Sequence, residues 1–286
     1  MTATEPSRPR LAAPAGATDT HMHIYEGRFP LAPTATFKPP EAPVTAYRAV
    51  CRRLGIERCV IVQPTGYGFD NACTLAGMAT FGPGARGICV VAPETTDGEL
   101  LRLHGLGIRG VRFHMLPGGV LGWDALPTLA AKVAPLGWVI DLQLNGREFP
   151  SIVDRIRNLP ARIVVDHIGK FLEPPVPPEH LSVRCLLDLL ATGRFWVKLS
   201  APYDVSASGP PGYDDASAIA RALVRAAPER VLWASNWPHP GPPTDKPKPK
   251  PDDAALLDLL LDWAPDEPTR QRILVDNPAA LFGFDG

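Results

Sequence analysis

Eight short β-rich runs alternate with longer helical patterns along this 286-residue chain. Their centres lie about 25–40 residues apart, which leaves room for a helix and two loops between neighbouring runs. Continuous β-branched stretches such as VIV and IVV suit strands that are buried on both faces, as in a parallel sheet. The runs cover residues 19–24, 58–63, 86–92, 108–115, 138–144, 162–168, 195–201 and 230–236.

Between and after these runs, apolar residues at helical spacing predict helices at residues 43–54, 124–136, 181–192, 214–227 and 254–264. Eight strand–helix units in one chain predict a single (β/α)₈ TIM barrel, an α/β fold. An open doubly wound sheet is disfavoured, because no GxGxxG motif follows the first strand. We expect the barrel to span residues 17–286, after a flexible lead-in at residues 1–16.

Composition narrows the class of partner. Lys and Arg number 29 against 30 Asp and Glu, so the chain has no global charge that would attract nucleic acid or an anionic membrane. No apolar run reaches the length of roughly 18 residues that suggests a membrane span. Five scattered cysteines without CxxC spacing argue against a disulfide framework and favour a reducing, cytoplasmic location. Assembly into a homo-oligomer stays open.

Three histidines fall at the carboxyl ends of predicted strands, where barrel enzymes place their active sites. His21 and His23 are two residues apart on the first strand, so their side chains point to the same face. His167 ends the sixth strand. Imidazoles gathered in this way can hold one metal ion or polarise one carbonyl oxygen.

The roles of other polar residues are inferred from their positions on the predicted strands and the loops that follow them. Asn236 ends the eighth strand, and an amide cannot take up a proton near neutral pH. His239 follows in the same loop, as a loop anchor or an alternative base. His114 shares the strand parity of Arg112 and is expected to line the pocket. Lys198 could be catalytic, but we favour a snorkelling lysine or a structural ion-pair residue.

As a set, the motifs TDTHMHI, IVQPTGYGFDN, VDHIGK, VKLSAP and WASNWPHP occur in the order and spacing of the amidohydrolase superfamily. Over residues 16–283 the chain resembles one group within it. That group comprises 2-pyrone-4,6-dicarboxylate lactonases, sulfomuconolactone hydrolases and galactarolactone isomerases.

The resemblance implies roles for individual residues. His21, His23 and His167 would surround a lactone carbonyl and stabilise its developing oxyanion. Arg112 would bind a substrate carboxylate. The family's general base is an aspartate that matches Asn236. Residues expected to contact substrate or shape the pocket are Thr65, Tyr67, Gln143 and Tyr203.

The departures from the family matter equally. A second and a third family arginine would fall at Gly118 and Asp204, so we expect a pyrone dicarboxylate to be a poor substrate and a less charged lactone to fit better. Three accounts of Asn236 stay open. His239 or Asp141 could replace the missing base, the reaction could be an isomerisation, or the substitution could be inactivating.

The sequence therefore predicts a hydrolase that opens a lactone of a small carboxylic acid in aromatic or sugar-acid catabolism. The alternatives are a lactone isomerase, a zinc-dependent decarboxylase and a catalytically impaired binding barrel. We expect no cofactor, because Asn236 cannot accept a proton from metal-bound water and Gln143 is not a bridging lysine. A single zinc or other divalent ion stays open, with His21, His23 and His167 as its ligands.

Overall fold

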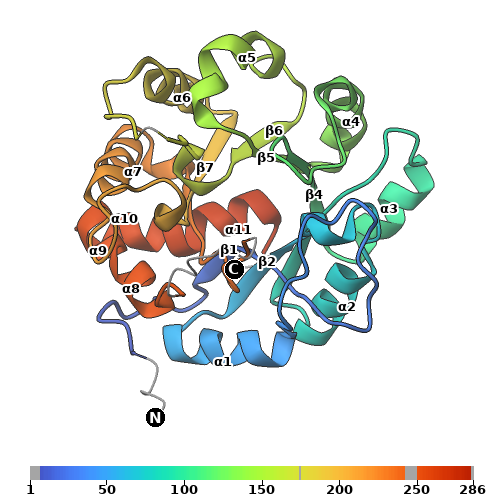
Figure 1. Ribbon diagram of the computed structural model, residues 1–286, viewed down its shortest axis with the longest axis horizontal. Helices are drawn as coiled ribbons and strands as arrows, with labels where there is room; N and C mark the ends of the chain where they lie inside the picture. The colour runs from blue at the N-terminus through green and yellow to red at the C-terminus, as the bar shows by residue number, and fades with distance from the viewer. Residues whose placement is uncertain (1–6, 174, 242–249, 285–286) are drawn as a thin grey trace.

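Eight strands form the centre of the computed structural model, which describes residues 7–173, 175–241 and 250–284 (Figure 1). Each strand pairs in parallel with the next one along the chain. The strands are β1 (Thr18–Met22), β2 (Arg58–Val62), β3 (Ala85–Cys89), β4 (Ile108–His114), β5 (Val139–Gln143), β6 (Arg162–Val165), β7 (Phe195–Leu199) and β8 (Val231–Trp233).

The sheet closes on itself where β8 meets β1. The amide of Asn236 donates to the carbonyl of His21 at 2.9 Å, and the amide of His23 donates to the carbonyl of Trp237 at 2.8 Å. These bonds lie at the carboxyl end of β1 and just beyond the carboxyl end of β8, so β8 and β1 are joined on the side of the barrel where the strands end. The predicted TIM barrel is confirmed.

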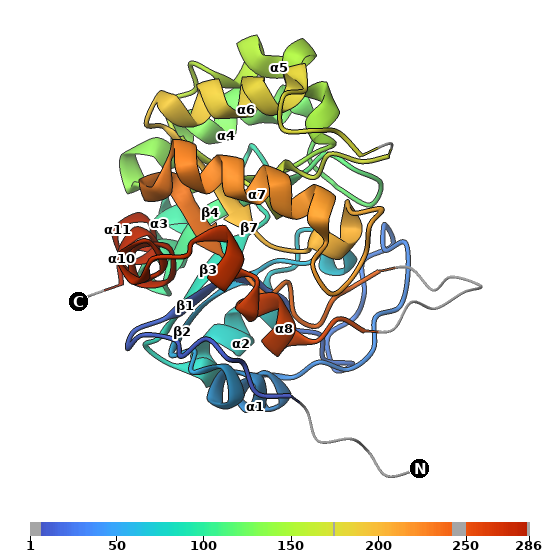
Figure 2. The ribbon, with the colours of Figure 1, turned by 90° about the vertical axis from the view of Figure 1, so that its left-hand side faces the viewer.

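Helices surround this barrel. Figure 2 shows α5, α6 and α7 stacked side by side on one flank, and each packs on the next. The helices are α1 (Val44–Leu54), α2 (Ala72–Phe81), α3 (Asp97–Gly105), α4 (Leu126–Val133), α5 (Phe149–Ile156), α6 (Leu181–Ala191), α7 (Asp214–Ala226), α8 (Asp253–Asp258), α9 (Leu260–Trp263), α10 (Glu267–Gln271) and α11 (Asn277–Phe282).

Helix α1 illustrates why these segments fold as they do. Its buried residues Val44, Tyr47, Cys51 and Leu54 recur at intervals of three or four, so they form one apolar stripe against the barrel. The helix ends at Gly55, whose φ of 75° is readily adopted by glycine and closes the last turn. The 124–136 segment is helical throughout as predicted, but only its middle, α4, is an α-helix.

All eight strands end one to three residues before their predicted bounds. Two of the largest differences concern site residues, because β6 stops at Val165 instead of residue 168 and β8 stops at Trp233 instead of residue 236. The cause is local: His167 and Asn236 adopt φ values of 54° and 59°, a left-handed conformation that cannot continue a strand. Both side chains are thereby set on turns at the barrel mouth.

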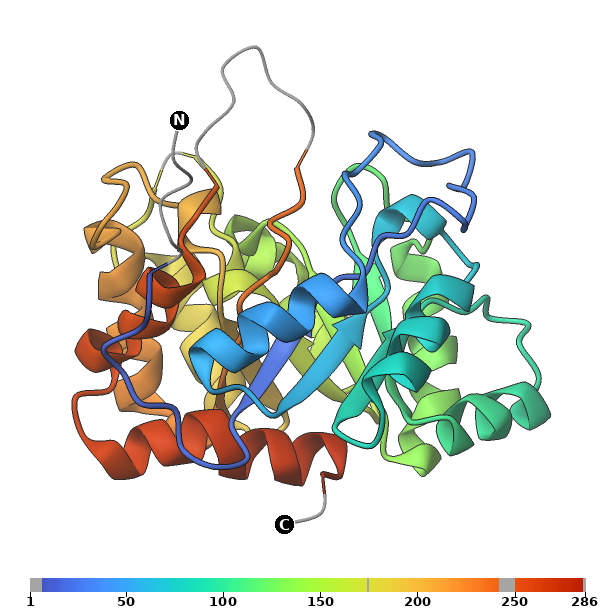
Figure 3. The ribbon, with the colours of Figure 1, turned by 90° about the horizontal axis from the view of Figure 1, so that it is seen from below.

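The interior of the barrel is layered. Near the amino ends of the strands it is apolar, with Val139, Val164 and Trp196 packed together and Phe282 closing the layer from below. Figure 3 shows the red C-terminal helices α10 and α11 lying across this end, opposite the long loops. Two residues further along their strands, the same inward positions carry charged groups, so the barrel changes from apolar to ionic toward its mouth.

The described residues before β1 are anchored to the rest of the protein. Leu11 is buried, and its amide donates to Asp258 at 2.9 Å. Residues 1–6 of the expected flexible lead-in lie outside the described residues. All five cysteines are free. None of the helices in the described ranges is long and apolar enough to cross a membrane.

Candidate active site

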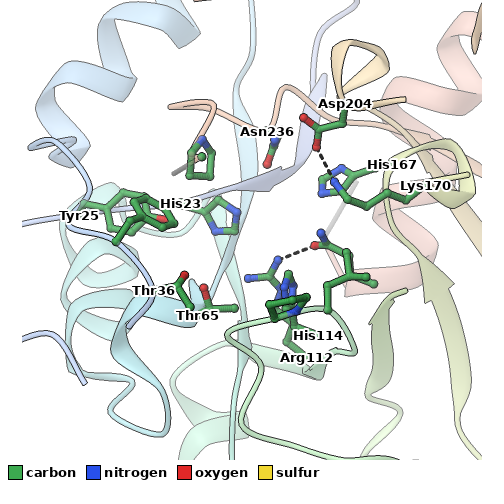
Figure 4. Close-up of a pocket in the computed structure, with 16 residues that line it drawn as sticks. His23, Tyr25, Thr36, Thr65, Arg112, His114, His167, Lys170, Asp204 and Asn236 are labelled. Carbon is green, nitrogen blue, oxygen red and sulfur yellow. Dashed lines mark hydrogen bonds and ion pairs between the residues drawn. The ribbon is translucent and has the colours of Figure 1, made fainter. Parts of the chain in front are cut away.

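A cavity of about 350 Å³ opens at the carboxyl ends of the strands. Figure 4 shows side chains from opposite sides of the barrel converging on it. Seven of the residues predicted from the sequence line this cavity: His23, Thr65, Arg112, His114, Gln143, His167 and Asn236. The other four, His21, Tyr67, Tyr203 and His239, lie behind or beneath its wall.

His23 is fixed by the seam and by its neighbour strand. Its amide bonds across to Trp237, and its ring Nδ1 lies 2.8 Å from the carbonyl oxygen of Val62. A carbonyl only accepts, so Nδ1 carries the proton of the neutral ring. The ring of His23 is thus held at the cavity wall by two elements of the barrel.

His21 lies directly beneath His23. The two Nε2 atoms are 3.2 Å apart, and the rings are nearly perpendicular at 89°. The other nitrogen of His21, Nδ1, lies 3.1 Å from Oδ1 of Asp166. His21 is fully buried, so it reaches the cavity only through its neighbours.

His167 completes the group from the turn after β6. Its ring centroid is 4.9 Å from that of His21, and its Nδ1 lies 2.8 Å from the hydroxyl of Ser200. The structure therefore brings the three predicted histidines together. The strand parity of His21 and His23, and the predicted meeting of strand ends, account for that arrangement.

Burial keeps these imidazoles neutral. It lowers the pKa of His23 and the pKa of His114 to about 3. Burial also lowers the pKa of His21 and of His167 well below the ordinary value. A neutral imidazole can donate one hydrogen bond and accept another, which suits it to polarise a carbonyl oxygen near neutral pH.

An ionic layer lies under the histidines. The ammonium of Lys198 contacts the carboxylates of Asp141 and Asp166, and all three side chains are fully buried. Burial and the carboxylate of Asp166 raise the pKa of Asp141 to about 7. Burial alone would raise the pKa of Asp166, but His21 and Lys198 hold it well below its usual range. The layer matches the interpretation of Lys198 as an ion-pair residue, and it places Asp141 below the cavity.

Arg112 is the cation that faces the cavity without a carboxylate. Its Nη1 donates to the carbonyl of Gln63 and its Nη2 to Oε1 of Gln143, both at 2.8 Å. Among the described residues no carboxylate lies within ion-pair distance of it, and its Nε has no hydrogen-bond partner. Neutral groups therefore orient the guanidinium, and its positive charge is available to bind an anion.

The sequence reasoning assigned no role to Lys170, which lines the cavity together with Asp204. The ammonium of Lys170 lies 2.5 Å from Oδ2 of Asp204, as the dashed line in Figure 4 marks. Lys170 is the last residue of the VDHIGK motif, so the signal was present in a segment that carried His167. The pair presents one donor and one acceptor instead of the positive charge that a third arginine would supply.

Asn236 belongs to a chain of hydrogen bonds behind the cavity wall. Its Nδ2 donates to the hydroxyl of Tyr203 at 2.9 Å, and that hydroxyl lies 2.9 Å from Nδ1 of His239. Nε2 of His239 lies 2.9 Å from the carboxylate of Asp253. Both nitrogens of His239 are engaged, so the geometry fits a loop anchor better than a base facing substrate.

Tyr67 differs from the expectation for a substrate pocket, whereas Gly118 agrees with the expected absence of a family arginine. Tyr67 is buried away from the cavity, where its hydroxyl lies 3.1 Å from the amide of Glu26. Gly118, where a family arginine would fall, has a φ of 96°, and a side chain there would be strained. The loop after β4 therefore does not present a second guanidinium.

Three side chains near the cavity floor carry atoms that could bind a metal ion. Among the described residues, ligand atoms of His21, Asp166 and His167 lie within 4.8 Å of one another. The ammonium of Lys198 lies 3.0 Å from Nδ1 of His21 and 2.9 Å from Oδ1 of Asp166. A divalent ion on these two atoms would face a second cation, so this group does not fit a metal as arranged.

Comparison with known proteins agrees with the geometry. A family model described as "Amidohydrolase" matches residues 18–284. A 4-sulfomuconolactone hydrolase of Rhizobium radiobacter is 37% identical over 96% of this chain and 92% of its own length. A D-galactarolactone isomerase of Agrobacterium fabrum is 34% identical, over 96% and 93%. A ligand-free crystal structure from Agrobacterium tumefaciens has a TM-score of 0.89 and 34% identity, covering 97% of this chain and 99% of that one.

Proposed function

This chain belongs to the amidohydrolase family, and on that premise we propose that it hydrolyses a lactone that carries one carboxylate. A single observation carries the proposal. One cavity combines neutral imidazoles with a guanidinium that no carboxylate neutralises. The relatives named above act, by their names, on lactones of small acids, which supports the same class of substrate.

In the proposed reaction His167 is the member of the histidine cluster that donates to the carbonyl oxygen of the lactone, because its Nδ1 can accept from the hydroxyl of Ser200 and its Nε2 can carry the proton. Water attacks the carbonyl carbon, negative charge moves onto the carbonyl oxygen, and donors preorganised in a buried site stabilise that charge. The bond between the carbonyl carbon and the ring oxygen then breaks. The ring oxygen takes one proton of the water, and the new carboxylic acid releases the other. Losing one such donor typically lowers kcat about 10²–10³-fold. Arg112 binds the carboxylate of the substrate and thereby fixes the ring relative to the histidines.

The substrate is proposed to be a monoanion with hydroxyl groups. Arg112 offers one unpaired positive charge, whereas the charge of Lys170 is matched by Asp204. A Lys–Asp pair can donate to and accept from a substrate hydroxyl, and Thr36 and Thr65 add two hydroxyls to the wall. A second substrate carboxylate would face Asp204 and lose a charge-assisted contact, worth about 1.5–3 kcal/mol.

Isomerisation is the second candidate, and Asn236 favours it. An amide can orient a hydroxyl but cannot accept its proton. If a substrate hydroxyl attacks in place of water, the acyl group moves between two oxygens of one molecule and no net proton is released. We propose a cytoplasmic setting for either reaction, in keeping with the five free cysteines.

A panel of lactones with one, two and no carboxylates tests the proposal. Acid release in a pH-stat reports hydrolysis, and a changed proton NMR spectrum without acid reports isomerisation. Release of carbon dioxide would instead indicate a decarboxylase. Tight binding without any turnover would indicate an impaired barrel, and either result would overturn the proposal.

A further inference from the structure

Lys198 contacts His21 as well as two carboxylates, and neutralising the carboxylates does not require the contact with His21. The lysine Nζ lies within 3.0 Å of two carboxylate oxygens, Oδ1 of Asp141 and Oδ1 of Asp166, and of one imidazole nitrogen, Nδ1 of His21. An ammonium has three N–H donors and no acceptor, so it can donate to all three atoms when Nδ1 of His21 carries no proton. The lysine is fully buried, so no bulk water is available to replace any of them.

The proton positions in the histidine pair follow from His23. Its Nδ1 must donate to the carbonyl of Val62, which leaves a lone pair on Nε2. That lone pair faces Nε2 of His21 at 3.2 Å. With both rings neutral, the proton between them must sit on Nε2 of His21. Nδ1 of His21 is then an acceptor, and Lys198 is the donor in reach.

The opposite tautomer of His21 fits the surroundings poorly. A proton on Nδ1 would point to Asp166, but it would also face the ammonium of Lys198 at 3.0 Å. The two Nε2 atoms would then present lone pairs to each other. Nitrogens about 2.0–2.1 Å from one tetrahedral zinc lie about 3.3–3.4 Å apart, so that tautomer would create a place for a metal. Metal-binding imidazoles usually donate their other N–H to a carboxylate or carbonyl, as these two would.

We propose that Lys198 is a positioning residue that holds His21 in the tautomer with its proton on Nε2. The N–H of His21 then bonds to His23, and a metal ion at this pair would have to displace that proton. His21 supplies the N–H of the pair, and His23 supplies the lone pair at the cavity wall. The assignment concerns the site of the proposed lactone chemistry, but it is tested without substrate, so the two can fail separately.

The tautomers are read directly from long-range ¹H–¹⁵N NMR spectra of the intact protein with labelled histidine. His21 is assigned by the loss of its signals in His21→Gln. The expected result near neutral pH is a proton on Nε2 of His21 and on Nδ1 of His23. A proton on Nδ1 of His21 would overturn the proposal. This measurement needs no change at Lys198 itself.

The zinc content of the protein is a second readout. It would not change on substitution of Lys198 if that residue had only a structural role. Lys198→Met combined with Asp141→Asn removes one positive and one negative charge, so the net charge of the layer is unchanged. Asp141→Asn alone is the matched control, because it keeps the contact between Lys198 and His21. Each protein is incubated with one equivalent of zinc chloride, desalted and analysed by mass spectrometry.

The double variant should retain close to one equivalent of zinc, at least tenfold more than the wild type and the control. Equal zinc content in all three folded proteins would contradict the proposal, as would stoichiometric zinc in the wild type. Circular dichroism checks that each variant is folded. If the double variant does not fold, the NMR tautomers of the wild type decide.

Discussion

Nδ2 of Asn236 lies 2.9 Å from the hydroxyl of Tyr203, and this contact determines which end of the amide is free. Asp253 accepts from His239, His239 accepts from Tyr203, and Tyr203 accepts from Asn236. The direction of donation is thus fixed along the chain. The amide oxygen of Asn236 is left buried without a hydrogen-bond partner, beside the cavity that the residue lines.

Replacing Asn236 with aspartate should therefore increase acid release from the lactone substrate. A carboxylate at this position can take a proton from water, and general base catalysis typically contributes about 10²–10⁴-fold. The measurement is kcat for ring opening in a pH-stat. Asn158→Asp, an equal charge change on the exposed surface, is the control. Unchanged or lower acid release in Asn236→Asp would show that this position does not limit the reaction.

Arg112→Met should weaken the use of substrates that carry a carboxylate. The lost charge-assisted hydrogen bond is worth about 1.5–3 kcal/mol, which corresponds to about a 10- to 150-fold fall in kcat/KM. A lactone without a carboxylate should be affected far less. Arg184→Gln on the exposed face of α6 serves as the control. An equal loss of kcat/KM on lactones with and without a carboxylate would indicate that Arg112 supports the structure of the pocket and does not bind the charge of the substrate.

Asp204→Asn should shift preference toward dicarboxylates. The change leaves the ammonium of Lys170 without its 2.5 Å partner and gives the cavity a second free cation. We expect the ratio of kcat/KM for a dicarboxylate lactone over a monocarboxylate lactone to rise about tenfold or more. Adding Lys170→Met should abolish the gain. Ready turnover of a pyrone dicarboxylate by the unmodified protein would contradict the proposed role of the pair.

Stability should fall as the solution is acidified from about pH 7 to about pH 4. His21, His23, His114 and His167 have a lowered pKa, so the unfolded chain takes up protons at a pH where the folded chain does not. Their contribution is present above the unfolded value of about 6.5 and is lost below it.

Asp141, whose pKa is raised to about 7, acts in the opposite direction but is outnumbered. Urea unfolding across this range measures the slope of the unfolding free energy against pH. His114→Gln should reduce that slope by about one proton. A protein that becomes more stable on acidification would refute the assignment of neutral imidazoles.

The fold could be predicted because each of its units repeats the same local pattern. Runs such as VIV and IVV, each followed by an amphipathic helix, leave few architectures other than the barrel. The parity of His21 and His23 predicted that both side chains face the inside of the barrel, where His23 lines the cavity and His21 lies beneath it, and the parity of Arg112 predicted that His114 lines the cavity. These inferences need only the alternation of strand side chains.

Other features depend on contacts between distant strands. Lys198 meets Asp141 and Asp166 because three strands place those residues at one depth of the barrel, and register between strands cannot be read from one sequence. The short β6 and β8 depend on left-handed turns at His167 and Asn236. Asn and His adopt this conformation more often than most residues, but still too rarely for the residue type alone to predict a turn. Lys170 reaches the cavity through the same turn after β6, where its φ is 44°.

The most direct test of the account is ring opening of a monocarboxylate lactone in water enriched in heavy oxygen, followed by mass spectrometry and NMR of the product. Hydrolysis at the polarised carbonyl predicts a ring-opened acid with one labelled oxygen in its new carboxylate. A rearranged lactone without label would identify the isomerase instead. If no lactone of the panel changes with either the wild type or Asn236→Asp, the claim that this cavity performs lactone chemistry is wrong.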